Sequence, residues 1–188
     1  GRAAVRFHLP PARAGEELTF EKLCAVTGDL EGVESAVADG ERHMQTLRSR
    51  SFDECLAEHV EAMERFWEAA DVEIDGDERS QLAVRFACWA TRIAAPDNEG
   101  ASSIGARNLT GDFYLGAVFW DMDMFQLPML SAVAPRLARN HVLYRARRLT
   151  PARALAQQDG WKGASYPWES FATGDVERPR FTTDDMGY

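Results

Sequence analysis

The sequence predicts a mainly α-helical chain that begins with two short strands. Apolar residues recur at three- and four-residue spacing over much of the chain after residue 29. A capping box, Ser51 with Glu54, stands directly before the most regular of these runs. Residues 3–27 instead alternate loosely between apolar and polar side chains. With 188 residues, of which 45% are hydrophobic, the chain can form one domain or pieces of two.

The first half of the chain predicts strands and then helices. Residues 3–27 predict two strands joined by a connection of about five residues. A helix with a weak apolar stripe is expected over 29–48, and a strongly amphipathic helix over 52–70. Residues 71–76 form an extended connector to a third predicted helix, 77–94. The apolar face of that third helix consists of Leu82, Phe86, Trp89 and Ile93.

The second half predicts a long polar loop from Pro96 and then further helices. One apolar helix follows the dipeptide Trp120-Asp121, and the next begins at Pro135 and reaches about residue 149. Thr150-Pro151 predicts an N-cap and first residue of a last helix, which Gly160 ends. Residues 161–188 show no clean period and predict loops with short extended pieces.

Charge and cysteine content exclude several classes. The net charge of −9, with acidic residues concentrated early in the chain, argues against nucleic acid as a partner. The basic run 136–153 has the spacing of a solvated helix face. Three cysteines without C-x-x-C spacing argue against a disulfide scaffold or a metal site. No apolar run suits a membrane, and the start reads as mid-course chain without a signal peptide, so we expect a cytoplasmic protein.

Two aromatic–carboxylate pairs, Trp120-Asp121 and Trp168-Glu169, are the candidate binding residues. A pyranose ring presents an apolar face, which suits an aromatic ring, and hydroxyl groups, which suit a carboxylate. Nearby Phe113, Tyr114, Phe119, Gly111 and Gly116 strengthen this hypothesis, because aromatic walls and close backbone approach are typical of saccharide sites. The alternatives are a core tryptophan beside an N-cap aspartate for the first pair, and an exposed tryptophan with a solvated acid for the second.

Neighbouring polar residues do not add a catalytic pair. Asp123 would lie about 200° around a helix from Asp121, which is a poor arrangement for two glycosidase acids. We expect Asp123 to be a first-turn residue that complements the helix dipole. His141 falls inside a predicted helix among arginines, and the sequence places no serine or cysteine nucleophile beside it.

A longer series of motifs resembles glycoside hydrolase family 65, in the N-terminal part of its catalytic region only. The matching segments keep their order and spacing across residues 104–179. They are Leu109-Thr-Gly-Asp, Gly116-x-Val-Phe-Trp-Asp, Phe125-x-Leu-Pro, Tyr144-Arg, Ala152-Arg, Gly160-x-Lys-Gly-Ala, Tyr166-Pro-Trp-Glu-Ser and Thr173-Gly. The family includes maltose, trehalose, kojibiose and nigerose phosphorylases.

The resemblance implies a β-sandwich, a helical linker and an (α/α)6 catalytic barrel. On that template residues 1–28 are the last strands of the sandwich, and 29–75 are the linker. Residues 76–188 are the first part of the catalytic barrel, which is truncated here. The predicted fold class is therefore mainly α, with part of an (α/α)6 barrel.

The resemblance also implies an inverting α-glucoside phosphorylase. Inorganic phosphate, as co-substrate, attacks the anomeric carbon of an α-linked glucose disaccharide while a glutamic acid protonates the leaving oxygen, giving β-glucose 1-phosphate. Trp120 and Asp121 would bind the transferred glucosyl unit, and Trp168 and Glu169 would lie at the same site. The family needs no other cofactor, and its members are often homodimers.

Some features leave the function open. The family's general acid and phosphate loop lie beyond the position of Tyr188, so we assign no catalytic residue and expect the chain alone to be inactive. Ala117 and Met122-Asp123 replace the family's common histidine and Thr-Glu, changes that touch the subsite lining and leave the acceptor sugar open. The alternatives are a hydrolase of the acid-trehalase kind, and a non-catalytic carbohydrate-binding or helical interaction protein.

Overall fold

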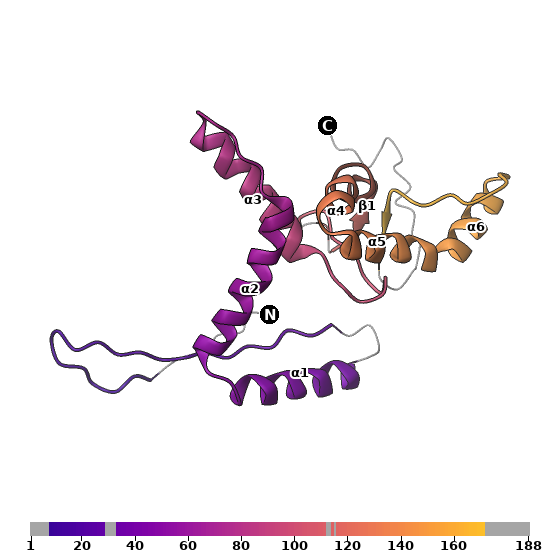
Figure 1. Ribbon diagram of the computed structural model, residues 1–188. Helices are drawn as coiled ribbons and strands as arrows, with labels where there is room; N and C mark the ends of the chain where they lie inside the picture. Colours follow the sequence, from indigo (N-terminus) through magenta and orange to yellow (C-terminus); the bar gives the residue numbers. More distant parts are fainter. Residues whose placement is uncertain (1–7, 29–32, 112–113, 115, 172–188) are drawn as a thin grey trace, which may run out of the picture. The chain divides into compact units, whose positions relative to one another are not determined.

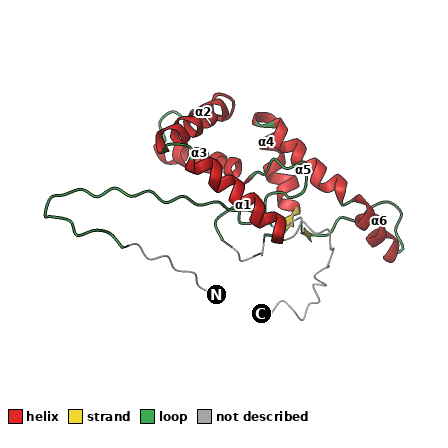
Figure 2. Cartoon of the chain, turned by 90° about the horizontal axis from the view of Figure 1, so that it is seen from below, coloured by secondary structure: helices red, strands yellow, loops and turns green. Residues whose placement is uncertain are grey.

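The protein is mainly helical, as predicted. The computed structural model describes residues 8–28, 33–111, 114 and 116–171 (Figure 1). They belong to two compact units, residues 1–51 and 52–188. Helices make up most of the ordered elements, and the strands of the described residues are two short segments in the second unit (Figure 2). The barrel geometry and the division into sandwich, linker and barrel segments stay predictions.

The first unit contains an extended segment and one helix, α1 (Val33–Arg48). The helix ends where the sequence predicts, but the strands expected over 3–27 are wrong for residues 8–27, which form no strand. Val5 and Phe7 lie outside the described residues. A strand needs a paired neighbour, and the described residues provide none here. Phe20 and Val26, which a sheet would have to cover, are accordingly 55% and 93% exposed.

Helices α2 (Phe52–Ala70) and α3 (Glu78–Ala94) open the second unit; α2 has the predicted bounds, and α3 ends where predicted but begins one residue later. Helix α2 begins one residue after Ser51, where the capping box places its start. Asp77 caps α3 by accepting hydrogen bonds from the backbone N–H groups of Arg79 (3.1 Å) and Ser80 (3.0 Å). The apolar face predicted for α3 is largely exposed, with Leu82 at 71% and Phe86 at 58%.

The rest of this unit is a small helical body with one strand pair. It contains β1 (Val118–Phe119), the π-helix η1 (Met122–Gln126), α4 (Leu127–Val133), α5 (Pro135–Arg147), α6 (Leu149–Gln158) and β2 (Glu169–Ser170). Helices α4 and α5 pack on each other, and α4 continues directly from η1. The buried core of this body consists of Ile104, Val118, Met122, Leu130, Leu137, Ala138 and Tyr144.

The boundary between α5 and α6 differs from the prediction. Helix α6 begins at Leu149, so Thr150-Pro151 is not its N-cap and first residue. The break lies at Arg148, a buried residue whose guanidinium donates hydrogen bonds to the carbonyls of Tyr144 (2.9 Å) and Phe171 (3.0 Å). This side chain turns inward and fixes the backbone there, and Pro151, three residues further on, is still tolerated in the first turn of α6. Helix α6 ends at Gln158, just before Gly160, as predicted.

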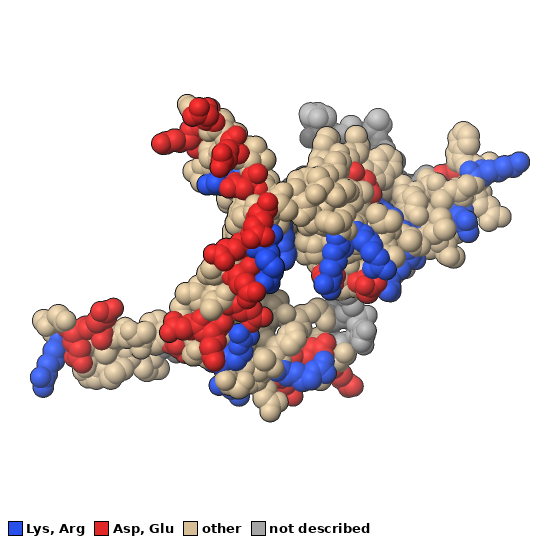
Figure 3. All heavy atoms as spheres, in the orientation of Figure 1, with Lys and Arg blue, Asp and Glu red and all other residues tan. Residues whose placement is uncertain are grey.

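The charged side chains are distributed in part as the sequence predicts. Figure 3 shows acidic residues along α2. In the basic run, Arg136 and Arg139 are exposed and pair with Asp97 and Glu99. Arg145 and Arg148 turn inward instead, so the interpretation of the run as a solvated face is wrong for these two.

Within the described residues, no helix is long and apolar enough to cross a bilayer. The same residues contain no group of three or more His, Cys, Asp or Glu side chains that could hold a metal ion.

Candidate functional site

A cleft of about 660 Å³ in the second unit contains most of the candidate binding residues. Asp121, Trp168 and Glu169 all line it, although they come from segments about fifty residues apart in the chain. The remaining lining residues are Ile104, Gly105, Ala106, Tyr114, Phe119, Met122 and Gln126.

The strand pair brings the two aromatic–carboxylate pairs together. Strands β1 and β2 are antiparallel, with Val118 opposite Ser170 and Phe119 opposite Glu169. The next position along each strand in this register holds Trp120 on one side and Trp168 on the other. Their rings meet edge to face, with centroids 5.2 Å apart and an interplanar angle of 72°.

The aromatic side chains form a continuous series along the cleft. Tyr114 packs on Phe119 at 5.3 Å, and Phe119 packs on Trp168 at 5.8 Å, both with near-perpendicular rings. Trp120 completes the series through Trp168, but it is not among the lining residues. Phe113 lies outside the described residues.

The carboxylate of Asp121 is not used as a helix cap. Asp121 has helical backbone angles and makes no side-chain cap hydrogen bond, and Trp120 is 42% exposed. The alternative of a core tryptophan beside an N-cap aspartate therefore does not describe this pair. Trp168 is also 42% exposed, but it lines the cleft, and Glu169 is half-buried beside it.

Close backbone approach forms another wall of the cleft. The N–H of Ala106 donates to the carbonyl of Ala117 at 3.0 Å. A Cβ atom on Gly105 would stand 3.2 Å from the carbonyl oxygen of Gly116, which is tighter than ordinary contact. Gly116 itself has φ of +78°, a left-handed conformation that favours glycine.

The sequence motifs missed several lining residues. Gly105, Ala106 and Gln126 are among them, and the only available signal for Gln126 was a polar residue between Phe125 and Leu127. Of the three positions that depart from the family's common residues, Met122 alone lines the cleft. Ala117 is fully buried, and Asp123 faces another set of partners.

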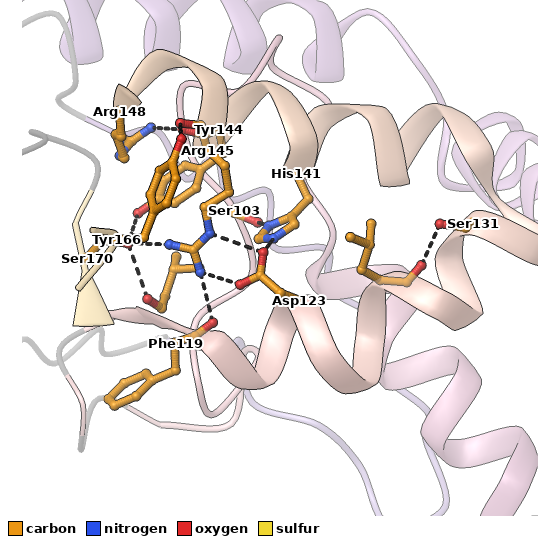
Figure 4. Close-up of polar contacts among 12 residues, drawn as sticks. Ser103, Phe119, Asp123, Ser131, His141, Tyr144, Arg145, Arg148, Tyr166 and Ser170 are labelled. Atoms are coloured by element: carbon orange, nitrogen blue, oxygen red, sulfur yellow. Dashed lines mark hydrogen bonds and ion pairs between the residues drawn. The ribbon is translucent and has the colours of Figure 1, made fainter. Parts of the chain in front are cut away.

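A polar network lies behind the strand pair (Figure 4). Asp123 accepts hydrogen bonds from Arg145 Nη2 at 2.5 Å and Nε at 3.2 Å, and its Oδ1 lies 2.7 Å from His141 Nε2. Burial raises the pKa of Asp123, but the hydrogen bonds of His141 and Arg145 and the charge of Arg145 outweigh it, so the pKa falls to about 2. Asp123 stands in the first turn of η1, as expected, but its main role is this ion pair and not the helix dipole.

The structure also corrects the interpretation of His141. Its Nδ1 lies 2.6 Å from the hydroxyl of Ser103, so a serine and an aspartate do flank this histidine. His141 is only 1% exposed, and neither it nor Ser103 lines the cleft. Because neither side chain borders the cleft, we interpret the row Ser103–His141–Asp123 as a structural clamp and not as a nucleophile with its base.

The fold and the cleft thus define a helical protein with an aromatic- and carboxylate-lined cleft, the kind of surface on which sugars bind. Residues 85–186 match the glycosyl hydrolase family 65 central catalytic domain. The chain belongs to this family.

Several relatives that the chain resembles are phosphorylases. It is 41% identical to kojibiose phosphorylase of Caldanaerobacter subterraneus subsp. tengcongensis over 74% of this chain and 18% of the relative. It is 34% identical to 1,2-alpha-glucosylglycerol phosphorylase of Bacillus selenitireducens over 92% of this chain and 22% of the relative. It is 35% identical to alpha,alpha-trehalose phosphorylase of Thermoanaerobacter brockii over 80% of this chain and 18% of the relative. The chain therefore spans about a fifth of the length of these curated relatives.

Proposed function

We propose that this chain forms the donor-glucose part of the active site of an inverting α-glucoside phosphorylase that releases β-glucose 1-phosphate. The observation that carries the proposal is the convergence of Asp121, Trp168 and Glu169 on one cleft. Membership of glycosyl hydrolase family 65 supports the reaction class.

The cleft has the chemistry that a glucosyl unit requires. Asp121 and Glu169 offer carboxylate oxygens, each of which accepts hydrogen bonds from adjacent hydroxyl groups. The Trp168 ring gives an apolar wall for the C–H face of the sugar, and Trp120 supports that ring from its edge. We assign no proton donor within these residues, so we expect residues 1–188 by themselves to bind glucose without turnover.

The relatives support a common donor site with variable acceptors. Their names give kojibiose, 1,2-alpha-glucosylglycerol and alpha,alpha-trehalose as substrates, which share a glucosyl unit and differ in its acceptor or in the position of the linkage. A glucosyl-binding cleft is what such enzymes have in common. The proposal therefore concerns the donor sugar and inorganic phosphate, and it leaves the acceptor to experiment.

The test replaces Asp121 by alanine in the full-length protein and measures β-glucose 1-phosphate release from a panel of α-glucosides with phosphate present. We expect kcat/KM to fall by about 100-fold, because two charge-assisted hydrogen bonds of about 1.5 kcal/mol each are lost. Asp97→Ala is the matched control, since Asp97 pairs with Arg136 at the surface and does not line the cleft. Activity of Asp121→Ala near that of the control would remove Asp121 from the donor site.

The same assay, together with a measurement of glucose binding, separates the two alternative functions. Turnover that does not depend on phosphate and releases free glucose would identify a hydrolase of the acid-trehalase kind. Glucose binding by the full-length protein without any turnover would identify a carbohydrate-binding protein.

A further inference from the structure

Arg145 contacts the chain at three separate places around the cleft. Its Nη2 donates to the carbonyl oxygen of Phe119 at 3.1 Å and to the carboxylate of Asp123 at 2.5 Å. Its Nη1 donates to the hydroxyl of Ser170 at 3.1 Å. Figure 4 shows the guanidinium between these groups, on a side chain that extends from α5 and is 12% exposed.

Each of these acceptors stands beside a candidate sugar-binding residue in the chain. Phe119 directly precedes Trp120, and Asp123 follows Asp121 by two residues. Ser170 directly follows Glu169. The guanidinium therefore joins both segments that carry an aromatic–carboxylate pair, although Arg145 is not itself a lining residue of the cleft.

Apart from the ring contacts of Trp168 with Phe119 and Trp120, the strand pair depends on polar side chains to fix its geometry. Strands β1 and β2 have two residues each, and a strand pair this short is marginal without side-chain support. The hydroxyl of Ser170 donates to the carbonyl of Val118 at 3.2 Å, and it lies 2.9 Å from the hydroxyl of Tyr144, the neighbour of Arg145 on α5. Side chains from α5 thus supply much of the polar support for the strand pair.

The partners of Arg145 are themselves held in place. Asp123 is fixed on its other side by His141, whose Nε2 lies 2.7 Å from Oδ1. A planar guanidinium with five N–H donors can contact three acceptors at fixed angles, whereas a lysine ammonium acts as a single point charge on a flexible stem. The arrangement therefore depends on arginine and not only on a positive charge.

We propose that Arg145 is a positioning residue that sets the spacing between the Trp120-Asp121 segment and the Trp168-Glu169 segment, and so determines the affinity of the cleft for the donor glucose. This inference rests on the proposed function, because it assumes that both segments bind one sugar. Arg145 acts through Phe119, Asp123 and Ser170 and does not contact the substrate.

The experiment compares Arg145→Met and Arg145→Lys with wild type in the full-length protein, well below each variant's Tm. Binding of glucose is followed by tryptophan fluorescence, and KM and kcat are measured for phosphorolysis of the preferred α-glucoside. We expect the glucose Kd and the KM of Arg145→Met to rise more than tenfold. Arg145→Lys should stay within threefold of Arg145→Met, because the ammonium cannot join the three acceptors.

Two further variants separate positioning from general stability. Arg139→Met removes an exposed ion pair with Glu99 on the same helix and should stay within threefold of wild type. Ser170→Ala removes one of the three acceptors of Arg145 without removing the charge, together with the Ser170 contacts to Val118 and Tyr144, and we expect its glucose Kd to rise about threefold to tenfold. Arg145→Lys, which keeps the positive charge, decides the question if Arg145→Met does not fold.

The failures of the two proposals are distinguishable. If wild type neither binds glucose nor cleaves an α-glucoside, the proposed function fails, and the role of Arg145 fails with it. If wild type does both, and the folded Arg145 and Ser170 variants keep wild-type Kd and KM with only a lower Tm, Arg145 is merely structural and this inference is overturned. Wild-type affinity in Arg145→Lys would also overturn it.

Discussion

Arg145 and Asp123 form a side-on ion pair, with Nε 3.2 Å from Oδ1 and Nη2 2.5 Å from Oδ2. Two parallel hydrogen bonds of this kind fix orientation as well as distance. The pair joins α5 to the π-helix η1, an element that is rare in proteins and often occurs at functional sites. It therefore holds the turn that follows Asp121 against the body of the domain.

The Asp123 ion pair predicts a dependence of stability on acid pH. The pKa of Asp123 falls from 3.8 to about 2 on folding, so its contribution to stability is present above pH 4 and is lost as pH falls toward 2. We expect urea unfolding to show a gap between wild type and Asp123→Asn that shrinks over this window by about 1 kcal/mol, a discounted value because Asp123 is 33% exposed.

The difference between the free energies of unfolding of wild type and Asp123→Asn contains its own control, since all other carboxylates titrate in both proteins. A gap that stays constant between pH 5 and pH 2 would mean that the carboxylate of Asp123 gains nothing from its partners in the folded state. It would remove the electrostatic part of the network around Arg145.

Gly100, in the loop after α3, should tolerate no side chain. Gly100 has φ of +80°, and a Cβ atom there would stand 2.5 Å from the backbone nitrogen of Tyr144. Its N–H donates to Asn140 Oδ1 at 2.8 Å, so the loop cannot move away without losing that bond. We expect Gly100→Ala to lower the free energy of unfolding by about 3 kcal/mol or more.

Gly76→Ala is the matched control for this clash. Gly76 also has φ of +80°, but nothing lies within 4 Å of its added Cβ atom. It should cost only about 1 kcal/mol, from the left-handed backbone alone. Equal losses in the two variants, measured by urea unfolding, would show that the contact with α5 does not limit the loop.

Local signals predicted much of the helical fold. The start of α2 and the end of α3 agree with a capping box and a following proline. Gly160 likewise predicted the end of α6. Each of these signals acts over a few residues, so an isolated sequence contains it in full.

Contacts between distant residues were not predictable in the same way. The pairing of Phe119 with Glu169 fixes the cleft, yet neither two-residue strand has a detectable alternating pattern. Arg145 and Arg148 looked like their exposed neighbours, because only their partners in other segments distinguish them. The partners of Asp123 lie 18 and 22 residues later in the chain, and helical periodicity does not predict the π-helix on which Asp123 stands.

Gln126 carries a buried polar atom whose removal should stabilise the protein. Its Oε1 is shielded from solvent and has no hydrogen-bond partner among the described residues, and its Nε2 makes one long contact, 3.3 Å, with Asn108. Gln126→Leu should raise the free energy of unfolding by about 1 kcal/mol, because an unsatisfied buried acceptor costs about 1–3 kcal/mol and a long hydrogen bond returns less. Gln126→Glu, which places a charge at the same site, should lower it. Gln126 borders the cleft, but its Oε1 is shielded from solvent. Gln126→Leu should therefore keep the glucose Kd within threefold of wild type. A lower free energy of unfolding for Gln126→Leu would contradict the stability prediction. A tenfold weaker Kd would instead identify Gln126 as a ligand of the sugar, whose Oε1 accepts a hydrogen bond from a sugar hydroxyl group when the cleft is filled.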